Sequence, residues 1–443
     1  MSFQFIGIMN NFFSYLQIGL VACTLLIGCR QKRLNVTDEI AAIDVVHNLG
    51  KYQSIPVSRF VSELAYIPLE TGNYCLIGED ISNIIVTNSH IFLAGSNYCY
   101  DFDRKGRFIG NISRIGQGPG EYQSIVSLSI DLKKQSLYIE TFRNILEYSW
   151  DRVFRQSINK PIDNPIDNVS FVRDKLFIGH VPNYSGHELY SFLLFDKSGQ
   201  VIKSFDNHIT IDRPQPRYLK TEHAMQPFKI SESIYVKENT NDTLYCLNEH
   251  NELIPLFVFD LGKYTFSKEK RNIMPNVSSS LESLKGTIEI PDSFTPMVGI
   301  PNYIFFSINA RELPKNIPFP QKKVQSYVVP SGFQIIGYLE SHNVVGIYDV
   351  VNKTTLLLDT DPVSWMFGLI NDLDGGLSFW PKYYTSENEM VDIWQAYEMK
   401  AYLTEEYFAA HEIKDPEAFQ KLKELLKNLD EEDNPVIVIG KLK

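Results

Sequence analysis

Residues 91–109 contain an apolar triplet, Ile91-Phe92-Leu93, a second strand, Tyr98–Phe102, and a polar turn, Asp103-Arg104-Lys105-Gly106, that leads into Arg107-Phe108-Ile109. An aspartate can accept hydrogen bonds from the backbone of its own turn, and glycine readily adopts the positive φ at which a chain reverses. This stretch therefore predicts three short antiparallel strands, of which the last two are joined by a tight hairpin.

The same unit recurs along the chain. About 93 residues, or two steps of about 46, separate the turns that open at Asp103 and Asp196. Further turns are Asn248-Glu249-His250-Asn251 and Asp349-Val350-Val351-Asn352, and a degenerate copy has Trp150-Asp151-Arg152. A period of 40–50 residues with three or four short strands is typical of a β-propeller. We count five clear units and a sixth over Gly368–Tyr402, and we predict an all-β, six-bladed β-propeller.

The two ends of the chain are predicted to close the ring. The C-terminal run Asn434–Gly440 is apolar and β-rich, and Val57–Glu70 could pair with it in one blade. A short helix is predicted over about 415–429, with Asp415 as N-cap and Pro416 in the first turn. Phe266–Lys285 and Asn309–Gln325 are predicted to be inserted loops on one rim. The propeller would thus occupy residues 57–443.

The N-terminus predicts export and lipidation. Residues 1–29 contain no charged side chain, and the apolar run Ile18–Ile27 ends at Gly28-Cys29. This run suits a signal peptide and is shorter than the ~20 residues of a membrane-spanning helix. We predict a lipoprotein signal peptide over 1–29, lipid attachment at Cys29 and a linker over 30–56. An uncleaved anchor over Phe12–Gly28 is the alternative, because no basic residue precedes Cys29.

Composition excludes some classes of protein. The chain has 443 residues, 53 Asp and Glu against 42 Lys and Arg, and a net charge of −11, which argues against nucleic acid as a partner. Five cysteines do not make a disulfide framework. Cys75, Cys99 and Cys246 lie in apolar, strand-like contexts and are predicted to be buried thiols, although a Cys75–Cys99 disulfide stays open. Length alone would suggest two or three domains, but a ring grows by adding blades.

Four segments of the chain resemble the six-bladed β-propeller lipoproteins of Bacteroidota, whose architecture is related to TolB-like and NHL-like propellers. They are Tyr66–Thr71, Gly106–Tyr122 with its Gly-Gln-Gly-Pro-Gly-Glu-Tyr phrase, Asn371–Pro381 with Asn-Asp-Leu-Asp-Gly-Gly, and Asn434–Lys443. The resemblance implies the fold and a location in the bacterial cell envelope, but no general activity. The stretch after Cys29 is basic, whereas related surface lipoproteins often carry acidic residues there, so the periplasmic face is favoured over the cell surface.

Two loops and a tryptophan supply the candidate binding residues. Gly116–Gly120 lacks the following helix and the lysine of a phosphate-binding loop, so we interpret it as a connector between blades. Its neighbours could line the mouth of the ring. Asp372 and Asp374 resemble half of a calcium loop, although a turn held by side-chain-to-backbone bonds is favoured. Trp380 could stack on a sugar, but packing between blades is the commoner role. The candidates are Arg114, Gln117, Glu121, Tyr122, Asn371, Asp372, Asp374 and Trp380.

No catalytic constellation is apparent in the sequence. It contains no Gly-x-Ser-x-Gly elbow, and its nine histidines are scattered, so we assign neither catalytic residues nor a metal site or cofactor. The leading hypothesis is a membrane-tethered, monomeric propeller that binds or scaffolds a glycan, peptide or protein. The alternative is a calcium-dependent hydrolase or lyase with carboxylates at the propeller axis, which rests on analogy with other propellers.

Overall fold

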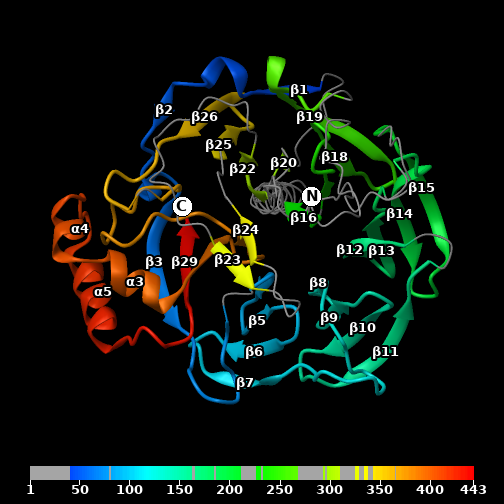
Figure 1. The fold of residues 1–443 in the computed structure, drawn as a ribbon, viewed down its shortest axis with the longest axis horizontal. Helices are drawn as coiled ribbons and strands as arrows, with labels where there is room; N and C mark the ends of the chain where they lie inside the picture. Colours follow the sequence, from blue (N-terminus) through cyan, green and yellow to red (C-terminus); the bar gives the residue numbers. More distant parts are fainter. Residues whose placement is uncertain are drawn as a thin grey trace, which may run out of the picture. The chain divides into compact units, whose positions relative to one another are not determined.

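The repeated unit folds as an antiparallel sheet, and six such sheets surround a common axis as the blades of a propeller (Figure 1). The prediction of an all-β, six-bladed propeller is confirmed. The computed structural model describes residues 40–443 except 79–80, 162–164, 184–185, 211–225, 231–232, 268–292, 295–296, 310–324, 329–333, 338–342 and 365. Cys29 and most of both predicted insertions lie outside the described residues. All of the blades belong to the unit Ala41–Lys443.

Blades 1 to 3 each contain four strands in sequence order. Blade 1 consists of β4 (Asn83–Val86), β5 (His90–Ala94), β6 (Cys99–Asp103) and β7 (Phe108–Asn111). Blade 2 consists of β8 (Ser127–Asp131), β9 (Ser136–Glu140), β10 (Asn144–Ser149) and β11 (Phe154–Asn159). Blade 3 consists of β12 (Asp167–Arg173), β13 (Leu176–His180), β14 (Tyr190–Asp196) and β15 (Val201–Asp206).

Blades 4 to 6 recruit strands from the N-terminal part of the described chain. Blade 4 contains β16 (Phe228–Ile230), β17 (Ser233–Val236), β18 (Thr243–Leu247), β19 (Leu253–Asp260) and β1 (Ala41–Asp44). Blade 5 contains β20 (Ser293–Phe294), β21 (Val298–Ile300), β22 (Tyr303–Asn309), β25 (Asn343–Asp349), β26 (Thr354–Leu358) and β2 (Tyr52–Gln53). Between β22 and β25 lies the hairpin β23 (Gln325–Val328)–β24 (Gln334–Gly337). Blade 6 contains β27 (Tyr383–Tyr384), β28 (Glu389–Trp394), β29 (Val436–Leu442) and β3 (Val61–Pro68).

The hairpin turns form as their sequences predict. Asp103 Oδ1 accepts hydrogen bonds from the backbone N–H groups of Lys105 (2.8 Å) and Arg107 (3.0 Å), and Gly106 has φ +80°. Asp196 and Gly199 repeat this arrangement in blade 3. In the degenerate copy Arg152 itself takes the positive φ, +65°.

The charged residues of these turns also bind the preceding blade. Each of three turns places a cationic side chain against a carboxylate of its neighbour. The pairs are Arg104 Nη2–Glu389 Oε1 at 2.8 Å, Arg152 Nη1–Asp101 Oδ2 at 2.9 Å and Lys197 Nζ–Glu147 Oε2 at 2.6 Å. They join blades 1 and 6, 2 and 1, and 3 and 2. The turns therefore both reverse the chain and lock adjacent blades together.

The two ends of the chain close the ring within blade 6. C-terminal β29 pairs antiparallel with β28 on one side and with β3 on the other, in the register Ile437↔Ile393 and Ile437↔Ile67. The prediction that the C-terminal run pairs within Val57–Glu70 is confirmed. Pairing on both sides satisfies the backbone of β29 and leaves no free edge there.

Residues predicted to form a linker include two edge strands. β1 pairs in parallel with β19, and β2 pairs in parallel with β26. Between them lies the short 3-10 helix η1 (Val46–Asn48), and η2 (Val57–Arg59) leads into β3; η3 (Gly262–Tyr264) follows β19. The part of the 30–56 linker that the structure describes therefore adds outer strands to blades 4 and 5.

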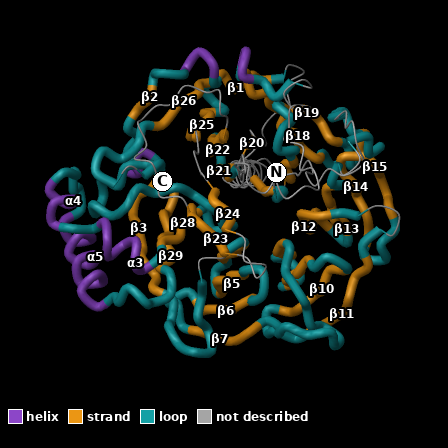
Figure 2. The backbone as a smooth tube through the Cα atoms, viewed as in Figure 1, coloured by secondary structure: helices purple, strands orange, loops and turns teal. Residues whose placement is uncertain are grey.

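Three α-helices group beside blade 6 (Figure 2). They are α3 (Ala396–Tyr402), α4 (Glu405–Ala409) and α5 (Pro416–Asn428). The predicted helix is confirmed as α5, and Asp415 caps it by accepting from the N–H groups of Glu417 and Ala418. Its Leu422 packs with Tyr407 and Phe408 of α4 in a buried apolar cluster.

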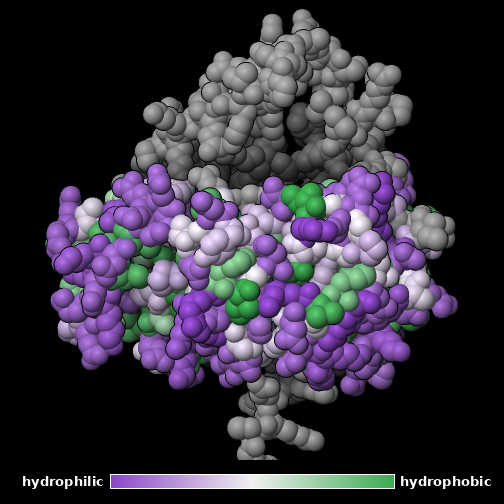
Figure 3. Space-filling view, turned by 90° about the horizontal axis from the view of Figure 1, so that it is seen from below, coloured by the Kyte–Doolittle hydropathy of each residue, from purple (hydrophilic) through white to green (hydrophobic). Residues whose placement is uncertain are grey.

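Apolar side chains of neighbouring blades share continuous cores. One cluster joins blades 1 and 2 and includes Ile85, Phe92, Leu128 and Leu137. Cys75, Cys99 and Cys246 are buried free thiols, and burial raises the pKa of Cys246 to about 11. Seen edge-on, the ring wall is mainly hydrophilic, with small separate hydrophobic patches (Figure 3). Among the described helices, none has the length and apolarity to cross a membrane.

Candidate functional site

The glycine-rich connector between β7 and β8 encloses a carboxylate of the chain itself. Glu121 Oε2 accepts the Gly118 N–H at 2.8 Å, while Glu121 Oε1 accepts from Arg114 Nε at 2.6 Å. A side chain at Gly116 would bring its Cβ within 2.0 Å of Glu121 Oε2, so this glycine makes room for the carboxylate. The Gly118 N–H and then the Arg114 guanidinium lower the pKa of Glu121. The loop is thus an anion-binding nest that is occupied by the carboxylate of Glu121 from the same chain.

The four candidates on this connector have different environments. Arg114 is 83% exposed, and Gln117 also faces solvent. Tyr122 instead lies in the core between blades 1 and 2, where burial raises its pKa. Arg114 and Gln117 are therefore available to a partner, whereas Tyr122 is not.

Asn371 and Asp374 form the centre of a buried polar network. Asp374 Oδ1 accepts hydrogen bonds from Tyr66 Oη (2.9 Å), Asn371 Nδ2 (2.7 Å) and the Gly376 N–H (3.0 Å). Burial raises the pKa of Asp374, and burial together with the nearby Asp374 raises that of Tyr66 well above its usual value. Because Tyr66 belongs to β3, the network ties the loop to the strand that closes the ring.

Asp372 makes a second connection from the same loop. Its Oδ2 accepts from Ser58 Oγ at 2.5 Å and from Lys414 Nζ at 2.6 Å, and its Oδ1 accepts the Ser58 N–H at 3.0 Å. Burial raises the pKa of Asp372, but the Lys414 and Ser58 hydrogen bonds outweigh it, so the pKa lies below its usual value. A cation bound by Asp372 would have to displace the Lys414 ammonium group.

Trp380 is half-buried between blades 5 and 6. Its ring packs edge-on against Phe305 at 5.4 Å between centroids, and its backbone N–H donates to Asp392 Oδ2. This environment matches the packing role that the sequence favoured. The structure thus brings Asn371, Asp372 and Asp374 together as a buried hub, while Arg114, Gln117 and Glu121 lie on a separate connector.

One end of the propeller collects exposed apolar side chains that the sequence analysis did not select. Within an antiparallel blade, the connector leading to the first strand and the loop joining the second and third strands lie at the same end. Hydrogen bonds join such segments in pairs, from Ile125 N to Ser96 O and from Asn183 Nδ2 to Ile209 O. We call this end in blades 1 to 3 the connector rim. Its most exposed large apolar residues are Leu76, Ile115, Phe142 and Leu189.

Comparisons with known proteins identify the fold and a family. A candidate exported protein from Bacteroides fragilis has a TM-score of 0.62 at 16% identity, and the alignment covers 91% of this chain and all of that one. A member of the DUF4221 family from Bacteroides vulgatus has a TM-score of 0.44 at 10% identity and covers 67% and 84% of the two chains. No curated protein matches the chain.

The first of these likenesses supports the propeller fold independently, because nearly the whole of both chains aligns. A family model described as a domain of unknown function matches residues 40–441, the region that forms all six blades. The chain therefore belongs to the DUF4934 family.

Proposed function

We propose that this protein is a lipid-anchored propeller of the bacterial cell envelope that binds a peptide or protein partner through the connector rim. The main observation in support is that the rim's apolar side chains are exposed to solvent. The exposed fraction is 77% for Phe142 and 75% for Leu189. Exposed apolar side chains that gather into one patch are typical of protein-binding sites. Arg143 is exposed on the same rim and favours a partner with an acidic residue beside its apolar ones.

The envelope location rests on the N-terminal sequence. The apolar run before Cys29 supports export and lipidation, and the basic residues after it support the periplasmic face. The B. fragilis protein is itself described as a candidate exported protein. Mass spectrometry of the protein from membranes should find Cys29 as a lipid-modified first residue. An intact residue 1 would overturn the anchor.

The rim is tested with a displayed library of random peptides. Enriched peptides should combine apolar and acidic residues, and the double variant Phe142→Ser/Leu189→Ser should weaken their binding at least tenfold. The matched control is Val153→Ser/Val351→Ser, whose residues are 61% and 66% exposed on turns that join third and fourth strands. Equal loss in both variants, or no enrichment on the wild-type protein, would contradict the proposal.

A further inference from the structure

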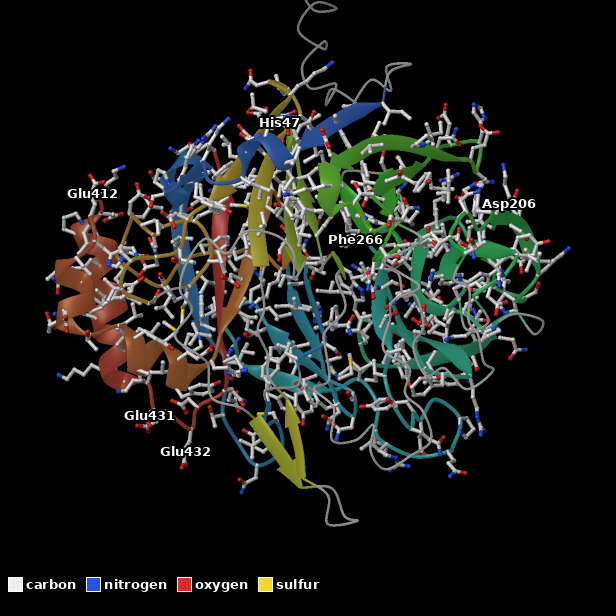
Figure 4. All side chains as sticks on the ribbon, turned by 45° about the horizontal axis from the view of Figure 1, so that its top comes forward. His47, Asp206, Phe266, Glu412, Glu431 and Glu432 are labelled. Carbon is white, nitrogen blue, oxygen red and sulfur yellow. The ribbon has the colours of Figure 1, made fainter. Side chains whose placement is uncertain are left out.

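We infer that Asp44, His47 and Asp260 form a binding site for a divalent transition-metal ion such as Zn²⁺. One potential ligand atom from each residue lies within 4.8 Å of the others. Asp44 ends β1, Asp260 ends β19, and His47 lies on η1 directly after β1 (Figure 4). The three side chains are therefore positioned by the junction of the N-terminal strand with blade 4.

Strand pairing forces the two carboxylates together. Asp44 and Asp260 are direct register partners in the parallel ladder of β1 and β19. Like charges placed directly opposite on neighbouring strands destabilise a sheet. In the described part of the chain, the only side chain that pairs ionically with either carboxylate is His47, whose Nδ1 lies 3.0 Å from Asp44 Oδ1. A bound cation would remove the repulsion that the fold imposes.

The remaining hydrogen bonds orient the carboxylates and leave ligand atoms available. Asp44 Oδ1 accepts the His47 N–H at 3.1 Å, and Asp260 Oδ1 accepts the Gly262 N–H at 3.0 Å. Asn48 Nδ2 donates to the Asp44 carbonyl oxygen, and the Val45 N–H to that of Asp260. Within the part of the chain that the structure describes, no hydrogen bond occupies the second oxygen of either carboxylate, so both can turn toward a metal.

The donor set selects the class of metal. One imidazole nitrogen with two carboxylate oxygens suits Zn²⁺ and related ions, whereas Ca²⁺ prefers six to eight oxygen ligands. Ligands at about 2.0–2.2 Å from Zn²⁺ must lie closer together than 4.8 Å, which requires small side-chain rotations. His47 is 74% exposed and Asp44 43%, so these rotations meet little resistance. A metal would fasten β1, a strand of only four residues, to blade 4.

The test is calorimetric titration of the metal-free full chain with ZnCl₂. We expect one binding site, and at least tenfold weaker binding for His47→Ala and for Asp260→Asn. The control His250→Ala removes an exposed histidine from the β18–β19 turn of the same blade and should bind as the wild type does. Circular dichroism establishes that each variant is folded.

A second measurement reports on the role of the metal. Zn²⁺ should slow proteolytic cleavage within residues 40–50 of the wild type severalfold, and it should have no such effect on His47→Ala. Absence of stoichiometric binding by the wild type, or unchanged binding by both site variants, would overturn the inference.

Discussion

Glu121 fills a nest that the glycines around it leave open. Successive backbone N–H groups in a glycine-rich turn attract anions, which is why such loops bind phosphate in other proteins. Here the anion comes from the residue that follows the loop, and Arg114 completes its coordination. The glycines are thus explained by the space that an internal carboxylate needs, without an external phosphate.

This assignment predicts that Glu121 orders the connector. Glu121→Ala should accelerate tryptic cleavage after Arg114 severalfold, because the guanidinium loses its partner and the loop opens more often. Gly116→Ala should have the same effect, since the new Cβ would collide with the Glu121 carboxylate. Peptide mass mapping over a time course gives the rates. Gly78→Ala serves as the control, because no atom lies within 4 Å of the added Cβ; equal rates for all three variants would contradict the nest.

The aspartates of this chain show which parts of a site can be predicted from the sequence. The aspartates of the hairpin turns were predictable, because they bind backbone groups two to four residues away. The environment of Asp372 was not, because its partners Ser58 and Lys414 lie 314 and 42 residues away along the chain. An Asp-x-Asp-Gly phrase is the same in an open calcium loop and in a buried hub. The two environments differ only in the residues that the closed ring brings next to the loop.

At the scale of elements, a buried ion pair attaches α4 and the segment after it to the ring. His411 Nε2 lies 2.5 Å from Asp361 Oδ2, and its Nδ1 lies 2.7 Å from the Tyr407 carbonyl oxygen. A carbonyl and an ionised carboxylate only accept hydrogen bonds, so both ring nitrogens of His411 must carry protons. The Asp361 hydrogen bond raises the pKa of His411. Burial raises that of Asp361, but the His411, Ser364 and Val363 hydrogen bonds outweigh it.

These shifts set the pH range in which the attachment stabilises the fold. The raised pKa of His411 gives stabilisation that is complete below about pH 6.5 and is lost as pH rises through that raised value. The lowered pKa of Asp361 keeps the pair intact down to about pH 4. His411→Gln should therefore lower the free energy of unfolding by about 3 kcal/mol near pH 6. The difference from wild type should shrink toward pH 9, as followed by denaturant titration.

His250→Gln is the control for this pH profile, since His250 is exposed on a turn. Its unfolding free energy should follow that of the wild type at every pH. If His411→Gln lowers the free energy of unfolding by the same amount at pH 6 and pH 9, the contact acts through packing alone. The stacking of Tyr407 on His411, at 4.1 Å between centroids, would then be the main interaction.

The elements that escaped prediction are short and depend on tertiary contacts. The helix α5 was predictable from its cap and its apolar stripe over 13 residues. Helices α3 and α4 have seven and five residues, lengths at which an isolated helix is unstable and packing decides. Strands β1 and β2, of four and two residues, exist because β19 and β26 offer free edges. Those edges are far away in sequence and carry no local signal.

At the scale of the whole molecule, the ring is closed by hydrogen bonds between its two ends. Covalent connectors cross every blade-to-blade boundary, including that between blades 6 and 1, where β3 continues into β4. Within blade 6, the β3–β29 ladder joins a strand from the early part of the described chain to its last strand, through pairs such as Glu63↔Lys441. Opening the ring there would expose two strand edges, and exposed edges promote aggregation. This ladder is therefore where a covalent link should stabilise the propeller most.

A disulfide across the closing ladder tests this directly. Glu63→Cys/Lys441→Cys joins register partners, whose Cα separation in an antiparallel ladder suits a disulfide. Oxidation should stabilise the protein by about 3–5 kcal/mol relative to the same variant reduced, because it constrains nearly the whole unfolded chain. Comparing oxidised with reduced protein cancels the loss of the exposed Lys441–Glu63 ion pair. Thermal and denaturant unfolding give the difference.

A disulfide from Lys441 to the strand on the other side of β29 provides the matched control. Lys441 is also the register partner of Glu389 on β28, so Glu389→Cys/Lys441→Cys links β29 to its other neighbour. That disulfide closes a much shorter loop and does not join the ends of the ring, so its oxidation should stabilise the protein by about 2 kcal/mol less. Equal gains from the two disulfides would mean that unfolding starts elsewhere in the ring. A larger gain at Glu63 would confirm that a covalent link across the β3–β29 ladder, which closes the longer loop, stabilises the propeller more.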